Sequence, residues 1–275
     1  MYLSQLKLDL RNRVTQNWLR NPYNIHRRLW MAFSDDIKEN DTITEDDTEK
    51  KEPKSAPFLY HFDTNSAVGN SISPRILVFS TQVPNWSNAF GEFSVLEEIP
   101  DKNHIKRISP EFIQTGITLR FLVKANPTKK VKDYRSLFKE ELKGYPVDRD
   151  YSNQKLYLKG KEKLEELKKG ITKEQREKLK SKKVGVYKEA DQLEWISKRG
   201  LENGFKILNV SIETKEDARA VKTKQGENHE IPKIHSVTFS GILKITEPEK
   251  FKTAYTKGIG PGKAFGCGML LLARV

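Results

Sequence analysis

The sequence predicts an α+β protein made of two tandem ferredoxin-like domains, each with the element order β-α-β-β-α-β. Strand-type and helix-type periodicities alternate in the same order in both halves of the 275-residue chain, although no close sequence repeat is visible. A polar stretch at residues 101–112 separates the halves, and 13 Phe, 9 Tyr and 4 Trp residues supply enough aromatic surface for real cores. We therefore expect domains at residues 1–105 and 106–275.

The first half opens with alternation of apolar and polar residues over 2–10, which predicts a half-buried strand. Asn21 and Pro22 are suited to the N-cap and first position of a helix. The buried stripe of that helix is expected to contain Ile25, Leu29, Ala32 and Phe33. Further elements are predicted as strands at 58–62, 74–81 and 93–99 and a helical turn after Pro84.

The second half repeats this order around a long basic insertion. Strands are predicted at 117–124, 206–213, 234–246 and 266–273, and helices at 191–203 and 248–257. The insertion covers about residues 130–190 and contains helix-forming runs such as EKLEELKKG. Its place inside the second domain makes it an appendage of that domain.

The net charge is +13, and it is unevenly distributed. Residues 129–190 contain 20 basic and 11 acidic residues, whereas residues 34–56 contain four basic and nine acidic ones and resemble a solvated loop. An excess of positive charge favours a polyanionic partner, above all nucleic acid. No stretch has the length and apolarity of a membrane span, and a lone cysteine excludes an internal disulfide or a thiolate zinc site. These features predict a cytoplasmic protein that binds nucleic acid.

A glycine-rich segment, Gly258–Gly268, joins the last predicted helix to the last predicted strand. Its spacing fits neither a Walker loop nor a dinucleotide-binding fingerprint. One interpretation is a structural turn; the other is a loop whose exposed N–H groups, with Lys263, approach a phosphate backbone. Gly260, Gly262 and Lys263 are the candidate RNA-binding residues here, and the sequence leaves both interpretations open.

The helix at residue 22 carries a second candidate group. Tyr23, His26 and Arg27 lie off its apolar stripe, in an N-terminal region of net charge +5. Histidine exchanges protons near neutral pH, as RNA cleavage by the ribose 2′-hydroxyl requires. An isolated helical histidine is nevertheless more often structural than catalytic.

A polar segment at residues 214–231 is the third candidate. It is either an exposed hairpin loop or a basic finger that grips RNA through Lys215, Arg219, Lys222 and Lys224. Metal-ligating patterns are absent, and no metal or cofactor is expected. The four other histidines have no ligand spacing and default to structural or surface roles.

Four segments together resemble a known family: MYLSQLKL, NPYNIHRRLW, LRFLVKANPTKK and GIGPGKAFGCGMLLL. They are similar to the type I-E CRISPR-associated endoribonucleases, which process guide-RNA precursors and belong to the repeat-associated RNA-binding superfamily. The resemblance leaves residues 34–56 and about 130–190 largely uncovered. It implies two ferredoxin-like domains, a catalytic role for His26 with Tyr23 beside it, and a role for the glycine-rich segment as the family's C-terminal signature.

The resemblance also implies an activity and partners. The expected enzyme cleaves CRISPR-repeat hairpins without a metal, leaving a 5′-hydroxyl and a 2′,3′-cyclic phosphate or 3′-phosphate. It then retains the product hairpin within the multisubunit surveillance complex. Lys129 and Lys130, at the start of the basic insertion, join the candidate RNA-binding residues.

Two alternatives remain open at this point. One is a non-catalytic RNA-binding subunit of the same architecture, which would bind hairpins without cleaving them. The other is a metal-dependent nuclease or phosphotransferase that uses a carboxylate pair such as Asp148 and Asp150.

Overall fold

The computed structural model describes most of the chain, in eleven segments. They are residues 1–20, 22–33, 56–63, 67–68, 71–72, 74–91, 95–146, 153–218, 221–224, 227–230 and 234–275. The chain forms two compact units: unit 1 comprises Met1–Pro127 and Val186–Val275, and unit 2 comprises Thr128–Gly185. Within the described segments, no helix is long and apolar enough to cross a membrane.

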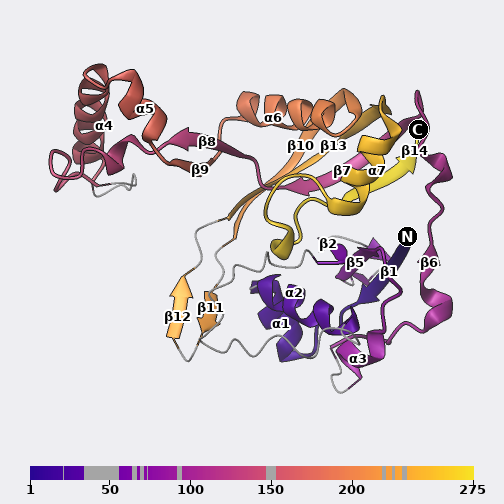
Figure 1. The fold of residues 1–275 in the computed structure, drawn as a ribbon. Coiled ribbons are helices and arrows are strands. Elements are labelled where there is room, and N and C mark those ends of the chain that lie inside the picture. Colours follow the sequence, from indigo (N-terminus) through magenta and orange to yellow (C-terminus); the bar gives the residue numbers. More distant parts are fainter. Residues whose placement is uncertain are drawn as a thin grey trace, which may run out of the picture. The chain divides into compact units, whose positions relative to one another are not determined.

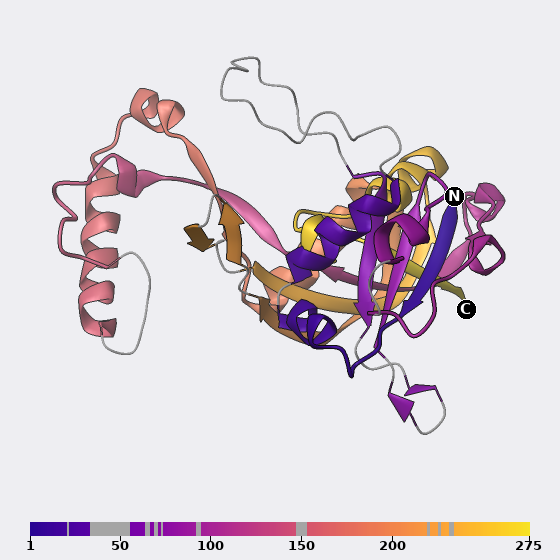
Figure 2. The ribbon, with the colours of Figure 1, turned by 90° about the horizontal axis from the view of Figure 1, so that it is seen from below.

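The first sheet of unit 1 has the strand order β2-β5-β1-β6, and every neighbouring pair is antiparallel. Its strands are β1 (Tyr2–Lys7), β2 (Phe58–Asp63), β5 (Arg75–Ser80) and β6 (Lys106–Arg107). The helices and short elements along this half are α1 (Arg13–Arg20), α2 (Pro22–Trp30), η1 (Met31–Phe33), β3 (Ala67–Val68), β4 (Ser71–Ile72), α3 (Trp86–Phe90), η2 (Lys102–His104) and η3 (Pro110–Phe112). Helix α2 packs against this sheet, because its Ile25 and Leu29 share one core with Ile76 and Val78 of β5, and Figures 1 and 2 show the helix next to these strands.

The second sheet repeats the same topology with the order β10-β13-β7-β14, again entirely antiparallel. Its strands are β7 (Thr118–Ala125), β10 (Phe205–Ala218), β13 (Ile234–Ile245) and β14 (Leu270–Arg274). The helices are α6 (Glu189–Glu202) and α7 (Pro248–Lys257), and η5 (Lys263–Phe265) lies in the glycine-rich segment. A short hairpin of β11 (Val221–Lys224) and β12 (Glu227–Glu230) intervenes between β10 and β13. Two ferredoxin-like sheets in tandem confirm the predicted fold class.

Each sheet has its own hydrophobic core. The stripe predicted for α2 is buried as expected: Ile25, Leu29, Ala32 and Phe33 all lie in the first core. In the second core, Phe205, Phe239 and Phe251 are among the largest fully buried side chains. Leu59 and Phe79, from the first sheet, belong to this second core, and the Phe79 ring lies 4.6 Å from that of Tyr255 on α7. The two sheets of unit 1 are therefore held together by apolar packing.

Several predicted elements differ from those observed. The prediction of a strand at 93–99 is wrong for the residues that the structure describes, because Leu96 makes only an isolated bridge with Leu8. Residues 92–94 lie outside the described segments. The fourth strand of the sheet is instead β6, whose short exposed sequence carries no apolar periodicity. Helix α1 was not predicted, and Asn21, the expected N-cap of α2, is not among the described residues. The division at residue 105 stays a prediction.

Unit 2 consists of a two-stranded ribbon and two helices. The ribbon pairs β8 (Thr128–Lys132) with β9 (Ser181–Gly185), and it leads to η4 (Tyr134–Ser136), α4 (Gln154–Lys169) and α5 (Lys173–Lys178). On α4, Gly160 is buried against Tyr145. A larger residue would not fit there, because its Cβ would lie only 2.7 Å from the Cβ of Tyr145. The predicted basic insertion thus forms a compact unit of its own.

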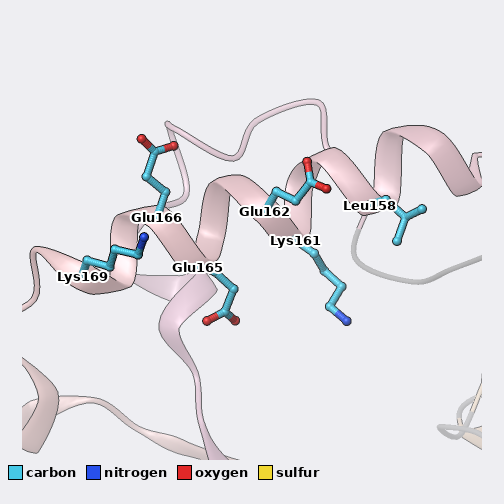
Figure 3. Close-up of a pocket in the computed structure, with 6 residues that line it drawn as sticks. All are labelled: Leu158, Lys161, Glu162, Glu165, Glu166 and Lys169. Carbon is cyan, nitrogen blue, oxygen red and sulfur yellow. The ribbon is translucent and has the colours of Figure 1, made fainter.

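Charge is arranged differently on the two parts of unit 2. The outer face of α4 mixes both signs: a shallow hollow there is lined by Leu158, Lys161, Glu162, Glu165, Glu166 and Lys169 (Figure 3). On the ribbon, by contrast, the exposed residues Lys130 and Lys183 are directly opposite one another. Like charges in this position destabilise a strand pair. The ribbon is therefore the better place in unit 2 for an anion to bind.

We predict that unit 1 folds without unit 2. Thr128 and Gly185 are partners in the β8–β9 ladder, and the Val186 amide donates a hydrogen bond to the Pro127 carbonyl (2.9 Å), so the two ends of the insertion are adjacent. Replacing residues 128–185 by a two-residue glycine turn should leave a cooperative thermal transition within a few degrees of the full chain, measured by circular dichroism. Loss of the transition would show that unit 2 is needed to complete the fold.

Candidate functional site

Helix α2 positions the candidate catalytic residues by burying one face and exposing another. Ile25 and Leu29 are fully buried and fix the helix against the first core. Tyr23 and His26, three residues apart, occupy the adjoining face, and their ring centroids are 6.3 Å apart. Arg27 is exposed on the same helix. The amphipathic pattern that predicted this arrangement is confirmed.

His26 lies among aromatic rings. Its ring centroid is 5.3 Å from that of Phe58 and 6.3 Å from that of Tyr60, both on β2. The indole Nε1–H of Trp30 donates a hydrogen bond to His26 Nε2 (3.1 Å). Because Nε2 accepts this bond, the proton of the neutral imidazole must sit on Nδ1, which is buried and has no hydrogen-bond partner among the described residues.

Burial lowers the pKa of His26 from 6.5 to about 4, so the imidazole is neutral at pH 7. Burial, the dominant cause, also lowers the pKa of His61 to about 4. In the unfolded chain both histidines take up a proton near pH 6.5, whereas in the folded chain they do so only near pH 4. Between these values the unfolded state binds more protons, and the free energy of unfolding therefore falls as the pH decreases from about 6.5 to 4.

The glycine-rich segment between α7 and β14 lies against α2. The Tyr60 hydroxyl donates a hydrogen bond shared between the carbonyl of Pro22, at the start of α2, and that of Ala264, in the segment (both 2.9 Å). The ring of Phe265 is 5.9 Å from that of Tyr23. Residues about 240 positions apart in the chain thereby form one site.

The local backbone of the segment explains several of its glycines. Gly262 has φ +84° and caps η5 in the left-handed region, where residues with a side chain are strained. Gly260 also has positive φ, and a Cβ there would lie 2.9 Å from the Trp195 ring on α6. Lys263 is exposed on η5; partial burial of its ammonium, followed by repulsion from Lys257, lowers its pKa. Gly260 and Gly262 therefore have a structural role, and an RNA contact by this segment stays a prediction.

The other predicted RNA-binding residues are located only in part. Lys215 is exposed near the end of β10 and forms an ion pair with Glu189 at the start of α6 (2.8 Å). Arg219 lies outside the described residues, and Lys222 and Lys224 are described only by their backbone, on β11. Lys129 and Lys130 belong to the ribbon of unit 2.

Tyr60 belongs to this site, although no sequence pattern predicted it. Its position in a predicted strand gave no sign that its hydroxyl would join α2 to a loop 204 residues away. Within the described segments, no three His, Cys, Asp or Glu side chains are grouped so as to hold a metal ion. Asp148 and Asp150 fall outside those segments.

We predict that Trp30→Phe raises the pKa of His26 above about 4, because the indole N–H stabilises the neutral imidazole and phenylalanine has no such donor. The pKa can be measured by NMR titration of the imidazole resonances. Tyr23→Phe, which leaves the indole in place, serves as the control. An unchanged His26 titration in the Trp30 variant would show that the hydrogen bond has no influence on protonation.

Known relatives resemble this chain over its full length. A CRISPR-associated endoribonuclease Cse3 from Thermus thermophilus is 23% identical, covering 99% of this chain and 100% of the relative. The CRISPR system Cascade subunit CasE from Escherichia coli K12 is 24% identical, covering 99% of both chains. Among solved structures, a Cse3 bound to a 19-nucleotide RNA superposes with a TM-score of 0.64 at 22% identity, covering 99% of this chain and 100% of that chain.

These structural likenesses, at such low identity, establish the fold. The family follows from a separate comparison, because the family model described as "CRISPR associated protein" matches residues 1–274. The chain therefore belongs to the CRISPR-associated protein family.

Proposed function

We propose that this protein is an endoribonuclease that cleaves CRISPR-repeat hairpins in precursor RNA and then keeps the product hairpin as a subunit of a cytoplasmic surveillance complex. The observation that carries the proposal is His26, held on α2 beside Tyr23, whose ring in turn lies 5.9 Å from that of Phe265 in the glycine-rich segment. The relatives support it, because their names describe an endoribonuclease and a Cascade subunit, and one solved Cse3 holds RNA as a pre-cleavage complex.

The proposed reaction is metal-independent. The ribose 2′-oxygen attacks its own 3′-phosphate as one group accepts the hydroxyl proton; the bond from phosphorus to the 5′-oxygen breaks, and a second group protonates that oxygen. The products are a 2′,3′-cyclic phosphate, which hydrolysis can open to a 3′-phosphate, and a 5′-hydroxyl. These steps need proton transfer and stabilisation of negative charge, and the site offers an imidazole, a phenol and cations for them.

His26 is proposed to transfer one of the two protons. In the free protein, Trp30 occupies Nε2 and Nδ1 is buried, so RNA binding must expose a ring nitrogen before transfer. Nearby phosphates would raise the pKa of the imidazole from its low value, because negative charge favours the protonated form. Tyr23 is proposed to orient the substrate or stabilise the charged phosphorane, and Lys263 and Arg27 to contact phosphates.

Binding is proposed to depend mainly on shape and phosphate contacts, as expected for an A-form RNA stem. The backbone at Gly260 and Gly262 would approach the RNA next to His26. The finger at residues 214–231, which contains the hairpin of β11 and β12, would grip the stem with Lys215, Arg219, Lys222 and Lys224. Unit 2 would add phosphate contacts through Lys129 and Lys130.

A non-catalytic RNA-binding subunit is the second candidate. The observation that favours it is that His26 is neutral, with Nε2 bonded to Trp30 and Nδ1 buried. Such a protein would bind the hairpin equally well but would leave it intact.

We predict that His26→Ala abolishes cleavage of a repeat hairpin and leaves its affinity within about tenfold, because the lost proton transfer is worth roughly 10²–10⁴ in rate. Tyr23→Phe should slow cleavage less.

Cleavage in the presence of EDTA, followed by analysis of the RNA ends, tests the metal-independent reaction and its products. The pH dependence of the cleavage rate then shows whether His26 acts as a general base or a general acid. If His26 is the base, the rate falls as the pH decreases through the pKa of His26 in the complex; if it is the acid, the rate falls as the pH increases through that pKa.

Wild-type cleavage rates in the His26 variant would remove the histidine from the reaction. Loss of activity in EDTA would favour the metal-dependent alternative. Tight binding without any cleavage by the wild-type protein would favour the non-catalytic subunit.

We also predict that Lys130→Gln combined with Lys183→Gln reduces the salt dependence of hairpin binding. If each lysine neutralises one phosphate, the slope of log affinity against log salt should fall by about 1 per lysine. The matched control is Lys161→Gln with Lys169→Gln, which removes the same charge from the mixed face of α4. Equal slopes for the two double variants would show that the ribbon does not contact RNA.

A further inference from the structure

Tyr187 presents an unusual surface for a large aromatic side chain. It precedes α6 and remains 59% exposed, although one side of its ring packs on His235 with centroids 4.6 Å apart. Its exposed ring surface can therefore receive another flat group. The charge pattern of the sequence, which predicted RNA binding, does not indicate this exposed aromatic ring.

The ring beneath Tyr187 is fixed by buried polar contacts. His235 is only 8% exposed, and its Nδ1 lies 2.7 Å from Asp217 Oδ1. The side-chain amide of the fully buried Gln192 donates to His235 Nε2 (3.0 Å) and to the Val186 carbonyl (2.9 Å). Since Nε2 accepts, the imidazole proton sits on Nδ1 and is donated to Asp217. Tyr187 thus rests on a support with one defined orientation.

The position of this pair connects the two RNA-binding elements proposed above. Trp195, which packs under Gly260 of the glycine-rich segment, lies on α6 six residues after Glu189, a distance of about 9 Å along the helix. Asp217 is the penultimate residue of β10, at the base of the finger. Tyr187 therefore lies at the base of the finger, through His235 and Asp217, and two residues before the helix that contacts the glycine-rich segment, with Lys188 exposed next to it.

The geometry points to a nucleobase-binding site: the exposed ring of Tyr187, supported by His235, stacks on an unpaired RNA base adjacent to the hairpin stem. Single-stranded bases are bound mainly by stacking on aromatic side chains, whereas bases inside an A-form stem are not accessible to such stacking. The inference rests on the proposed function, because it names a further contact of the same RNA.

The test uses the full chain and repeat RNAs that carry the fluorescent base 2-aminopurine at one unpaired position at a time. At one position, binding to the wild-type protein should change the fluorescence in a way that Tyr187→Ala abolishes. Tyr187→Ala should also weaken binding by about 5- to 150-fold, the usual loss when one stacking aromatic side chain is removed. Tyr187→Phe should behave as wild type, and Tyr187→Leu, which is apolar but not aromatic, should behave as Tyr187→Ala.

The matched control is Leu201→Ala, since Leu201 is 61% exposed near the other end of α6 and should have no effect. The inference is wrong if no labelled position distinguishes Tyr187→Ala from wild type, or if Tyr187→Leu retains full binding, as an apolar protein contact would. These outcomes leave cleavage by the wild-type protein intact. Failure of the wild-type protein to bind or cleave the hairpin would instead contradict the proposed function.

Discussion

The shared hydrogen bond from Tyr60 to Pro22 and Ala264 is the contact on which the site depends. Tyr60 is only 1% exposed, and burial raises the pKa of its phenol well above the ordinary value, so the hydroxyl keeps its proton as a donor. A buried carbonyl without a donor costs about 1–3 kcal/mol, which gives both segments a reason to stay in place. The ring of Tyr60 also stacks with that of His26, with centroids 6.3 Å apart.

Burial and reactivity oppose each other at His26. Aromatic packing against Phe58 and Tyr60 fixes the orientation of the imidazole, and the same packing holds its pKa near 4. A group that must exchange a proton near neutral pH needs its pKa brought back toward 7. Under the proposed function, bound phosphates would supply the required negative charge only once RNA is in place. The imidazole of the free protein would then be oriented before binding, and the substrate would complete the site electrostatically.

The sequence predicted the features that depend on local periodicity. The α2 stripe, the four strands of the second sheet, three of the four strands of the first sheet and the insertion all follow from patterns of apolar and charged residues. It did not predict contacts between distant segments. The Tyr60 hydrogen bond and the support of Tyr187 by His235 join residues that are 204 and 48 positions apart, and no local pattern encodes such a pairing. Strand β6 was missed because two exposed residues carry no periodicity at all.

The glycine-rich segment shows why a motif and a binding site need not be the same thing. Gly262 is required by its positive φ, and Gly260 by the Trp195 ring beneath it. Replacing either residue is therefore expected to disturb the local fold, and this would obscure any effect on RNA. Lys263 is different, because the path of the backbone does not depend on its partly buried ammonium. If the segment binds phosphate, Lys263 and the neighbouring backbone amides would therefore make the contacts. The glycines would allow the backbone to adopt the shape that presents these groups.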